Sequence, residues 1–166
     1  MIEGVSGSGK TSVATELQRR GYHVIHGDRE LAYRGDPRTG EPLDIDPSDP
    51  PNMDVAFGHR HHLWDVDKVR ALTADRSWPV TFFCGGSRNF DRFVGWFDAV
   101  FVLAVDHETL KWRLASRPDD EFGGTPAQRD FILGLSATRE NIPSGAIEID
   151  GTAPLARVVD AILAKC

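Results

Sequence analysis

The sequence predicts an α/β fold in which a five-stranded parallel sheet is flanked by helices in three layers. Apolar runs typical of strands alternate along the chain with segments of helical spacing. Residues 99–105 are continuously apolar, as expected for a parallel strand covered on both faces. With 166 residues, 40% of them hydrophobic, the chain lies in the usual single-domain range. We therefore expect one domain over residues 1–166.

Composition limits the classes of partner. The net charge of -6 disfavours binding to nucleic-acid backbones or anionic membranes, which normally needs a basic surface. No apolar run approaches the roughly 20 residues needed to span a bilayer, and no secretory signal precedes the first glycines. Cys84 and Cys166 are too few for a disulfide framework. We expect a cytoplasmic monomer or homodimer that binds small molecules, without nucleic acid or membrane.

The predicted elements alternate along the chain. Strands are expected at residues 1–3, 22–26, 80–84, 99–105 and 146–149, and helices at 10–20, 59–76, 89–97, 106–116, 127–139 and 155–165. Residues 34–52 are crowded with Pro, Gly and Asp, which predicts a long loop. Only three residues precede Gly4, so we expect the first strand to be clipped and the native N-terminus to lie further upstream.

One motif carries the chemistry. The segment Gly4-Val5-Ser6-Gly7-Ser8-Gly9-Lys10-Thr11, followed by Ser12, satisfies the Walker A pattern G-x-x-x-x-G-K-[ST] between a strand and a helix. Unpaired amides at the helix N-terminus form an anion nest for a phosphate. Lys10 would neutralise β- and γ-phosphate charge, and the Thr11 hydroxyl would hold Mg²⁺. The sequence therefore predicts a P-loop that binds ATP·Mg²⁺; an ordinary Gly/Ser-rich turn is the alternative.

The P-loop, the following strand and Gly27-Asp28-Arg29-Glu30 together resemble the small-molecule P-loop kinases, the adenylate, gluconate and shikimate kinase group. The resemblance covers nearly the whole chain and implies a three-layer fold like that of nucleoside and nucleotide kinases. It implies transfer of the ATP γ-phosphate to a small acceptor, with Asp28 orienting or deprotonating the attacking hydroxyl. A helix N-cap is the alternative role for Asp28.

The end of the third predicted strand, Cys84-Gly85-Gly86-Ser87-Arg88-Asn89, resembles the glycine-rich acceptor loop of shikimate kinases. Gly85 and Gly86 would let an acceptor approach the backbone. At Arg88 the segment resembles the phosphate-binding arginine of adenylate kinases, which implies a bidentate contact to an acceptor phosphate or carboxylate. A solvated loop arginine is the alternative.

Two further features concern the acceptor and the metal. We assign an acceptor-binding insertion to about residues 29–75, in which Arg29 and Arg34 are further acceptor-side cations. Cys84 stands where many P-loop proteins carry a Walker B aspartate, so the second Mg²⁺ contact is unassigned.

Residues 105–117 resemble the segment that enters the lid of adenylate kinases. Arg113 and Arg117 are four residues apart and share a helical face. The resemblance implies that Arg113 packs near the adenine and that Arg117 reaches the phosphates, with Arg129 or Arg139 closing from the far side. Solvated arginines are the alternative. The lid itself is predicted at about residues 117–128 and has no Cys₄ pattern for a structural metal.

Two other segments are open to more than one interpretation. Residues 149–156 resemble the adenine-binding loop of adenylate kinases, which places Ala153 and Pro154 beside the base; otherwise they form a capped turn. His59, His61 and His62 could be metal ligands, but their spacing favours a solvated or acceptor-facing helix start.

The leading functional hypothesis is an ATP-dependent kinase whose acceptor is a nucleoside or nucleotide. Leu31 stands where adenylate kinases commonly carry an arginine, which weakens a strict monophosphate interpretation. A sugar-acid or cyclitol acceptor is the alternative within the same class. From a different class, a nucleotide-dependent switch would hydrolyse ATP to order and release loops. An RNA-end kinase would need a basic groove that the acidic composition does not offer.

Overall fold

The fold is built on a five-stranded parallel sheet. A computed structural model of the protein describes residues 1–45, 54–140 and 142–166. The strands follow the order β2-β5-β1-β6-β7, and all adjacent pairs are parallel. They are β1 (Ile2–Glu3), β2 (His23–His26), β5 (Thr81–Cys84), β6 (Phe101–Ala104) and β7 (Ile147–Asp150). The predicted five-stranded parallel α/β fold is confirmed.

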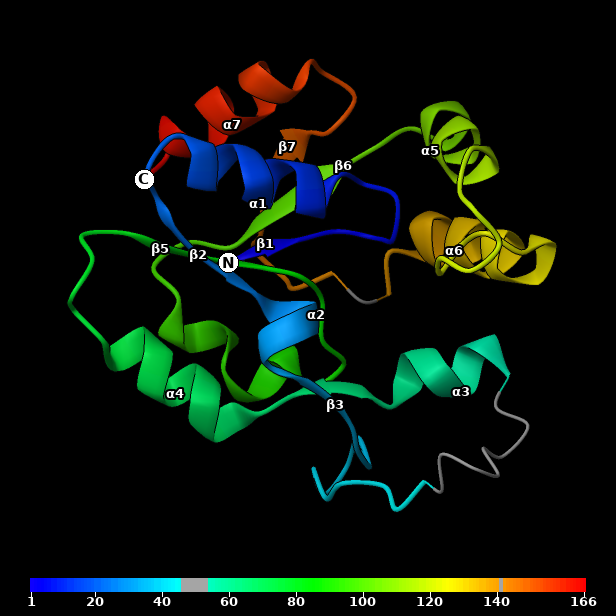
Figure 1. The fold of residues 1–166 in the computed structure, drawn as a ribbon, viewed down its shortest axis with the longest axis horizontal. Helices are drawn as coiled ribbons and strands as arrows, with labels where there is room; N and C mark the ends of the chain where they lie inside the picture. Colours follow the sequence, from blue (N-terminus) through cyan, green and yellow to red (C-terminus); the bar gives the residue numbers. More distant parts are fainter. Residues whose placement is uncertain (46–53, 141) are drawn as a thin grey trace.

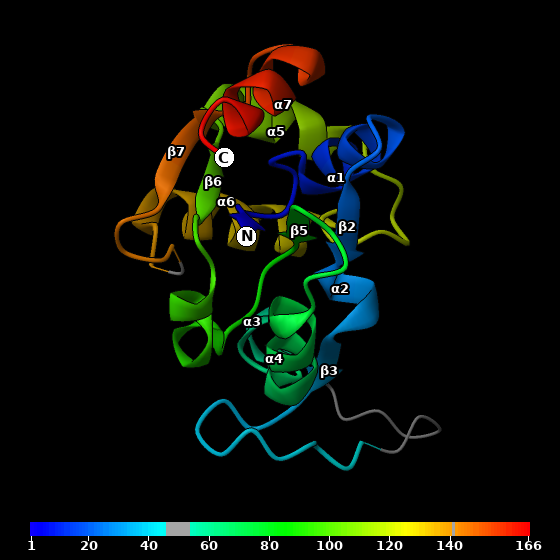
Figure 2. The same cartoon turned by 90° about the vertical axis from the view of Figure 1, so that its left-hand side faces the viewer.

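Helices cover both faces of the sheet (Figures 1 and 2). On one face lie α1 (Lys10–Arg19) and α7 (Leu155–Leu163), whose apolar residues join one core cluster with the strands. On the other face, α4 (Val66–Ala74) packs in a second cluster. At one end of the sheet, α5 (His107–Ala115) and α6 (Pro126–Thr138) lie together around Leu110, Leu114 and Ile132. The three layers are those that the sequence predicts.

The helix expected at residues 59–76 forms only in part, as α4, and the prediction of one continuous helix is wrong. The chain instead makes α3 (Val55–Arg60), the short strand β4 (His62–Trp64) and then α4. β4 pairs antiparallel with β3 (Ala32–Arg34), which fully buries Leu63 and Trp64. The carboxylate of Asp65 then caps α4 by accepting the amides of Asp67 and Lys68. The pairing of β4 with β3 therefore overrides the helical spacing of the apolar residues.

Other boundaries differ in smaller ways. The loop expected at residues 34–52 begins after β3, with a bridge between Gly35 and Pro42, and its residues 46–52 lie outside the described part of the chain. The same holds for residues 46–53 of the acceptor insertion assigned to residues 29–75. The helix expected at residues 89–97 is two 3-10 turns, Phe90–Arg92 and Val94–Trp96. Among the described residues, none of the helices has the length and apolar character needed to cross a bilayer.

A short helix that the sequence analysis missed, α2 (Gly27–Glu30), follows β2 directly and carries Asp28. It rests on Trp64, whose side chain has no exposed surface. A Cβ atom at Gly27 would lie only 2.0 Å from Cζ2 of that indole. The missing side chain at Gly27 is therefore what lets α2 approach β4.

Replacing Gly27 with alanine is expected to lower the free energy of unfolding by about 1–3 kcal/mol, because neither the buried indole nor α2 has room to move. Urea denaturation measures this change. Gly134→Ala is the matched control, because Gly134 lies in α6, where an added Cβ atom would meet nothing within 4 Å. Alanine there should raise the free energy of unfolding by at most about 1 kcal/mol. Equal stability of Gly27→Ala and the wild type would contradict the packing described.

Candidate active site

The P-loop turns between β1 and α1. Gly9 occupies the N-cap of α1 with φ of 107°, a left-handed conformation that only glycine adopts readily. The turn is closed by the amide of Ser8, which donates to the Val5 carbonyl at 3.1 Å. Lys10 folds back over the loop, and its Nζ donates to the carbonyl oxygens of Gly4 at 2.5 Å and Val5 at 3.1 Å. The ammonium group is thus held beside the phosphate nest that the motif predicts.

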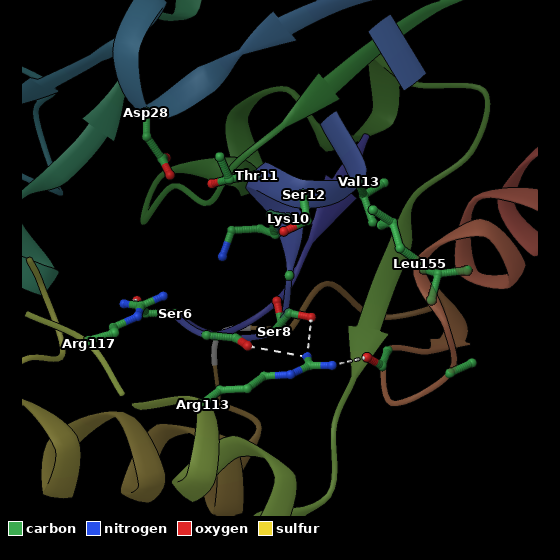
Figure 3. Close-up of a pocket in the computed structure, with 15 residues that line it drawn as sticks. Ser6, Ser8, Lys10, Thr11, Ser12, Val13, Asp28, Arg113, Arg117 and Leu155 are labelled. Carbon is green, nitrogen blue, oxygen red and sulfur yellow. Dashed lines mark hydrogen bonds between the residues drawn. The ribbon is translucent and has the colours of Figure 1, made fainter. Parts of the chain in front are cut away.

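A cavity of about 480 Å³ opens over this loop, and we call it the P-loop cavity (Figure 3). Most of the predicted nucleotide-binding residues line it, with Asp28 facing Lys10 and Thr11 from α2. The lining from that set comprises Ser6, Gly7, Ser8, Gly9, Lys10, Thr11, Ser12, Arg113, Arg117 and Ala153. Gly4 and Val5 line a neighbouring cavity, and Pro154 occupies the N-cap of α7 beside the lining.

Arg113 fastens the P-loop to the loop after β7. Its guanidinium donates to the carbonyl oxygens of Ser8 at 3.1 Å and Gly151 at 2.8 Å, and Figure 3 shows it lying between the two loops. Arg117, one turn later, donates to the hydroxyl of Ser6 at 2.8 Å and to the Phe122 carbonyl. Both arginines of the predicted pair therefore face the P-loop, Arg113 from α5 and Arg117 from just beyond the end of that helix, so the helical face that they were expected to share is not formed.

The two arginines proposed to close from the far side of the lid are occupied elsewhere. Arg129 donates to the carbonyl oxygens of Gly123 and Gly124, so it holds the backbone of the segment between α5 and α6. Arg139 forms an ion pair with Glu148 on β7. Neither residue lines the P-loop cavity.

A second cavity, of about 630 Å³, lies on the other side of Lys10, and we call it the α3 cavity because α3 forms one wall. It shares Ser6, Lys10, Thr11, Asp28 and Arg117 with the P-loop cavity. Its polar lining includes Glu3, His62, Gly86 and Arg88. The rest of its lining includes His59 and the apolar side chains of Val55, Phe122, Ile132, Leu135 and Ile142. The two cavities therefore meet at the P-loop lysine.

Asp28 stands at this meeting point. Its Oδ1 accepts from Nε2 of His62 at 3.2 Å and from the amide of Gly86 at 3.2 Å. Burial acts to raise the pKa of Asp28, but the bond from His62 and the charge of Lys10 outweigh it and hold the pKa below its ordinary value. The carboxylate is therefore ionised at neutral pH, with one oxygen already occupied by two donors.

The loop after β5 is fixed by β4. The amide of Trp64 donates to the hydroxyl of Ser87 and to Oδ1 of Asn89, both at 3.0 Å, and Nδ2 of Asn89 donates back to the Trp64 carbonyl at 2.9 Å. The amide of Arg88 donates to the His62 carbonyl at 3.0 Å. β4 thus positions both the Arg88 loop and, through the His62 side chain, Asp28.

The glycines of this loop make room for carboxylates. Gly85 has φ of 153°, and a Cβ there would lie 2.8 Å from Oδ1 of Asp28. A Cβ at Gly86 would lie 2.5 Å from Oε1 of Glu3. Gly86 lines the α3 cavity, whereas Gly85 is not among the lining residues. These glycines allow the close approach of Asp28 and Glu3 to the end of β5.

Sequence reasoning missed Glu3, the last residue of β1. The side chain is buried, its Oε1 accepts the Gly4 amide at 3.1 Å, and Nη2 of Arg88 lies 3.8 Å from the same oxygen. Burial raises the pKa of Glu3, against the opposing charges of Lys10 and Arg88. Oε2 of Glu3 and Nη1 of Arg88 are both buried without a hydrogen-bond partner among the described residues. An acidic residue directly before the P-loop was the available signal.

The remaining candidates of the sequence analysis are distributed over several places. Arg34 lines the α3 cavity and donates to the Gly58 carbonyl, whereas Arg29 lies exposed on α2, outside both linings. His61 contacts the Gly35 carbonyl through Nδ1, and the ring of His59 packs edge-on against Phe131. In the part of the chain that the structure describes, no three His, Cys, Asp or Glu side chains gather to hold a metal ion.

The donor set for Mg²⁺ is partly present. The hydroxyl of Thr11 lines both cavities beside Lys10, so it fits the role of a cation ligand next to bound phosphates. Cys84, at the end of β5, is buried, and burial raises the pKa of its thiol to about 12. A neutral thiol is a poor ligand for a hard cation such as Mg²⁺. The role of the Walker B aspartate is therefore not taken over by Cys84.

The family of the chain follows from its match to known proteins. A family described as AAA domain matches residues 1–129, a span that includes the P-loop, Asp28, Arg88 and the Arg113/Arg117 pair. The chain belongs to this AAA domain family. A search of curated proteins finds no match.

Solved structures similar to this AAA domain chain are P-loop small-molecule kinases. A gluconokinase from Sinorhizobium meliloti 1021 has a TM-score of 0.54 at 21% identity, covering 98% of this chain and 87% of that one. A sugar kinase from Janibacter sp. HTCC2649 has a TM-score of 0.56 at 19% identity, covering 98% and 90%. A deoxyadenosine kinase from M. mycoides, with bound dATP, has a TM-score of 0.52 at 14% identity, covering 99% and 96%. These likenesses confirm the kinase-like P-loop fold.

The imidazole of His59 gives this AAA domain chain a pH dependence that can be measured. Burial lowers the pKa of His59 from 6.5 to about 4. Between these values the unfolded chain binds a proton at His59 that the folded chain does not bind, so stability falls as the pH falls. Urea denaturation between pH 7 and pH 4 should show this slope, and His59→Gln should reduce it. His107→Gln, at an exposed histidine of α5, is the control, and an equal effect of both variants would contradict the assignment.

Proposed function

We propose that the protein is an ATP-dependent kinase that transfers the γ-phosphate of ATP·Mg²⁺ to a small-molecule acceptor. One observation carries this proposal: the P-loop cavity and the α3 cavity meet at Lys10, Thr11 and Asp28. A triphosphate bound on one side of Lys10 would present its γ-phosphate to a molecule bound on the other side. Two neighbouring cavities would hold both reactants together, as a transfer reaction between them requires.

On the nucleotide side, the P-loop amides would bind the β-phosphate, and Lys10 would exchange its two carbonyl partners for phosphate oxygens. Arg117 lies close enough to Ser6 to reach the same phosphates. Arg113 and the loop at Gly151 would form the wall beside the base, with Ala153. Mg²⁺, when bound at the Thr11 hydroxyl, would neutralise charge on the β- and γ-phosphates.

The transfer step would take place at Asp28. The acceptor hydroxyl would donate its hydrogen bond to the free carboxylate oxygen, because His62 and Gly86 occupy the other one. As the acceptor oxygen bonds to the γ-phosphorus, the bond from that phosphorus to the bridging oxygen of ADP breaks, and the hydroxyl proton passes to Asp28. Arg88 and Arg117 would stabilise the negative charge spread over the transferring group. The products are ADP and a phosphorylated acceptor.

Two acceptor classes have support. A nucleoside or nucleotide is our first choice, and the likeness to a deoxyadenosine kinase favours it. A sugar or sugar acid is the second, favoured by the likeness to a gluconokinase and to a sugar kinase. Sequence identities of 14–21% do not separate the two classes, so the acceptor must be found by assay.

A coupled ADP-release assay across nucleosides, nucleoside monophosphates, sugars and sugar acids tests the kinase function. At least one acceptor is expected to raise ADP release above the rate with ATP and Mg²⁺ alone. Lys10→Ala is the control and should abolish the increase, because it removes the charge that holds the phosphates. ATP turnover that no acceptor changes would instead support a nucleotide-dependent switch and would contradict the kinase proposal.

Replacement of Asp28 with asparagine should lower kcat by about 100- to 10,000-fold with little change in ATP affinity, because the amide cannot accept the hydroxyl proton. Steady-state kinetics and nucleotide titration measure the two effects. His62→Gln, which keeps a donor toward Oδ1, should retain more activity than His62→Ala. An unchanged kcat in Asp28→Asn would remove Asp28 from the transfer step.

A further inference from the structure

The α3 cavity contains a buried ion pair that ATP binding does not explain. Glu3 and Arg88 line this cavity and not the P-loop cavity. Their side chains are 4% and 11% exposed, and the contact from Oε1 to Nη2, at 3.8 Å, is longer than a hydrogen bond. Burying the Glu3 carboxylate costs hydration free energy. We therefore ask what this carboxylate does for Arg88 and for the acceptor site.

The two buried atoms without a partner come from the same ion pair. Oε2 of Glu3 and Nη1 of Arg88 lack partners among the described residues, and they are the second oxygen and second nitrogen of a carboxylate and a guanidinium already in contact. Such groups pair most strongly through two parallel hydrogen bonds. Glu3 is therefore placed to satisfy Arg88, and an acceptor anion would have to compete with it.

The charges around the cavity point the same way. The charged residues of the described chain that line only the α3 cavity are Glu3, Asp54, Glu121, Arg34 and Arg88. Of the charged residues shared with the P-loop cavity, Asp28 adds a fourth carboxylate, whereas Lys10 and Arg117 add two cations that would bind the phosphates of ATP. With ATP bound, four carboxylates would therefore face two guanidinium groups, those of Arg34 and Arg88. A phosphate or carboxylate on the acceptor would meet this excess, and like charges repel strongly in a partly buried site.

The apolar side chains of the cavity lining include those of Val55, Phe122, Ile132, Leu135 and Ile142. The guanidinium of Arg34 already donates to the Gly58 carbonyl, on the same helix as Val55. The imidazole of the same lining, His59, has a pKa lowered to about 4 by burial, so it is neutral at physiological pH. Apolar side chains around a neutral imidazole suit an acceptor that carries an uncharged ring.

We propose, on the basis of the kinase function proposed above, that the acceptor is an uncharged hydroxyl compound carrying an apolar or aromatic ring, and that Glu3 excludes anionic acceptors by neutralising Arg88. Arg88 then serves the transferring phosphoryl group or an acceptor hydroxyl. Glu3 acts through Arg88 and is a specificity-determining residue. Among the acceptor classes considered, the proposal selects neutral compounds such as nucleosides over nucleotides and sugar acids.

The test compares matched acceptors in the ADP-release assay: adenosine with AMP, thymidine with dTMP, and glucose with gluconate. For each pair that supports turnover by the wild type, kcat/KM is expected to be at least about tenfold higher for the neutral member. Glu3→Gln keeps the acceptor for the Gly4 amide and removes the charge, so it should raise kcat/KM for the anionic member by about tenfold. Glu121→Gln removes a charge from the exposed rim and should leave the ratio unchanged.

The outcomes separate this proposal from the kinase function on which it rests. Higher kcat/KM for the anionic members, or a selectivity ratio that Glu3→Gln does not move, would overturn the role of Glu3 while the kinase function stands. Absence of acceptor-dependent ADP release with every compound would overturn the kinase function itself. Circular dichroism shows whether Glu3→Gln is folded. If it is not, the ratio of kcat/KM for neutral over anionic acceptors in the wild type alone decides whether anionic acceptors are excluded.

Discussion

The pairing of β1 on both sides fixes the geometry of the site. The strand has only two residues, yet Ile2 pairs with Cys84 of β5 and with Phe101 of β6, and its side chain is fully buried. The Gly85 amide extends the ladder by donating to the Ile2 carbonyl at 3.1 Å. Because the strands are parallel, their carboxyl ends meet at one edge, where the P-loop leaves β1 between the Arg88 loop and α5. A shift of β1 would therefore move both cavities together.

The cations around the P-loop share one kind of partner. Lys10, Arg113 and Arg117 each donate to main-chain carbonyl oxygens. A carbonyl dipole orients a cation without cancelling its charge, so the charge remains available to a phosphate. Arg88 differs because its nearest ionic partner is the carboxylate of Glu3. The chain thus holds available cations on the nucleotide side, whereas on the acceptor side Arg88 is paired with a carboxylate and Arg34 donates to the Gly58 carbonyl.

The sequence predicted those parts of the structure that depend on contiguous residues. The P-loop is a local motif, the parallel sheet follows from alternating elements, and the helix expected at residues 106–116 forms as α5, where Asp106 accepts the Thr109 amide at 2.8 Å. β3 and β4 were missed because three-residue strands are too short to show a period, and because they depend on their pairing and on the bonds of Trp64 to Ser87 and Asn89. The contact from Glu3 to Arg88 was missed because it joins residues that are far apart in the chain and meet only in the sheet.

The β3–β4 pair explains why the acceptor is harder to infer than the nucleotide. Every P-loop protein must satisfy the same phosphates, so the residues on that side vary little in kind. The acceptor side is built from the segment between β2 and β5, where β4 presents His62 to Asp28 and α3 presents His59 to the cavity. A structural neighbour at 14–21% identity can have the same sheet and entirely different contacts in this segment. The charge and polarity of the α3 cavity are therefore a better guide to the acceptor than the activity of any structural neighbour.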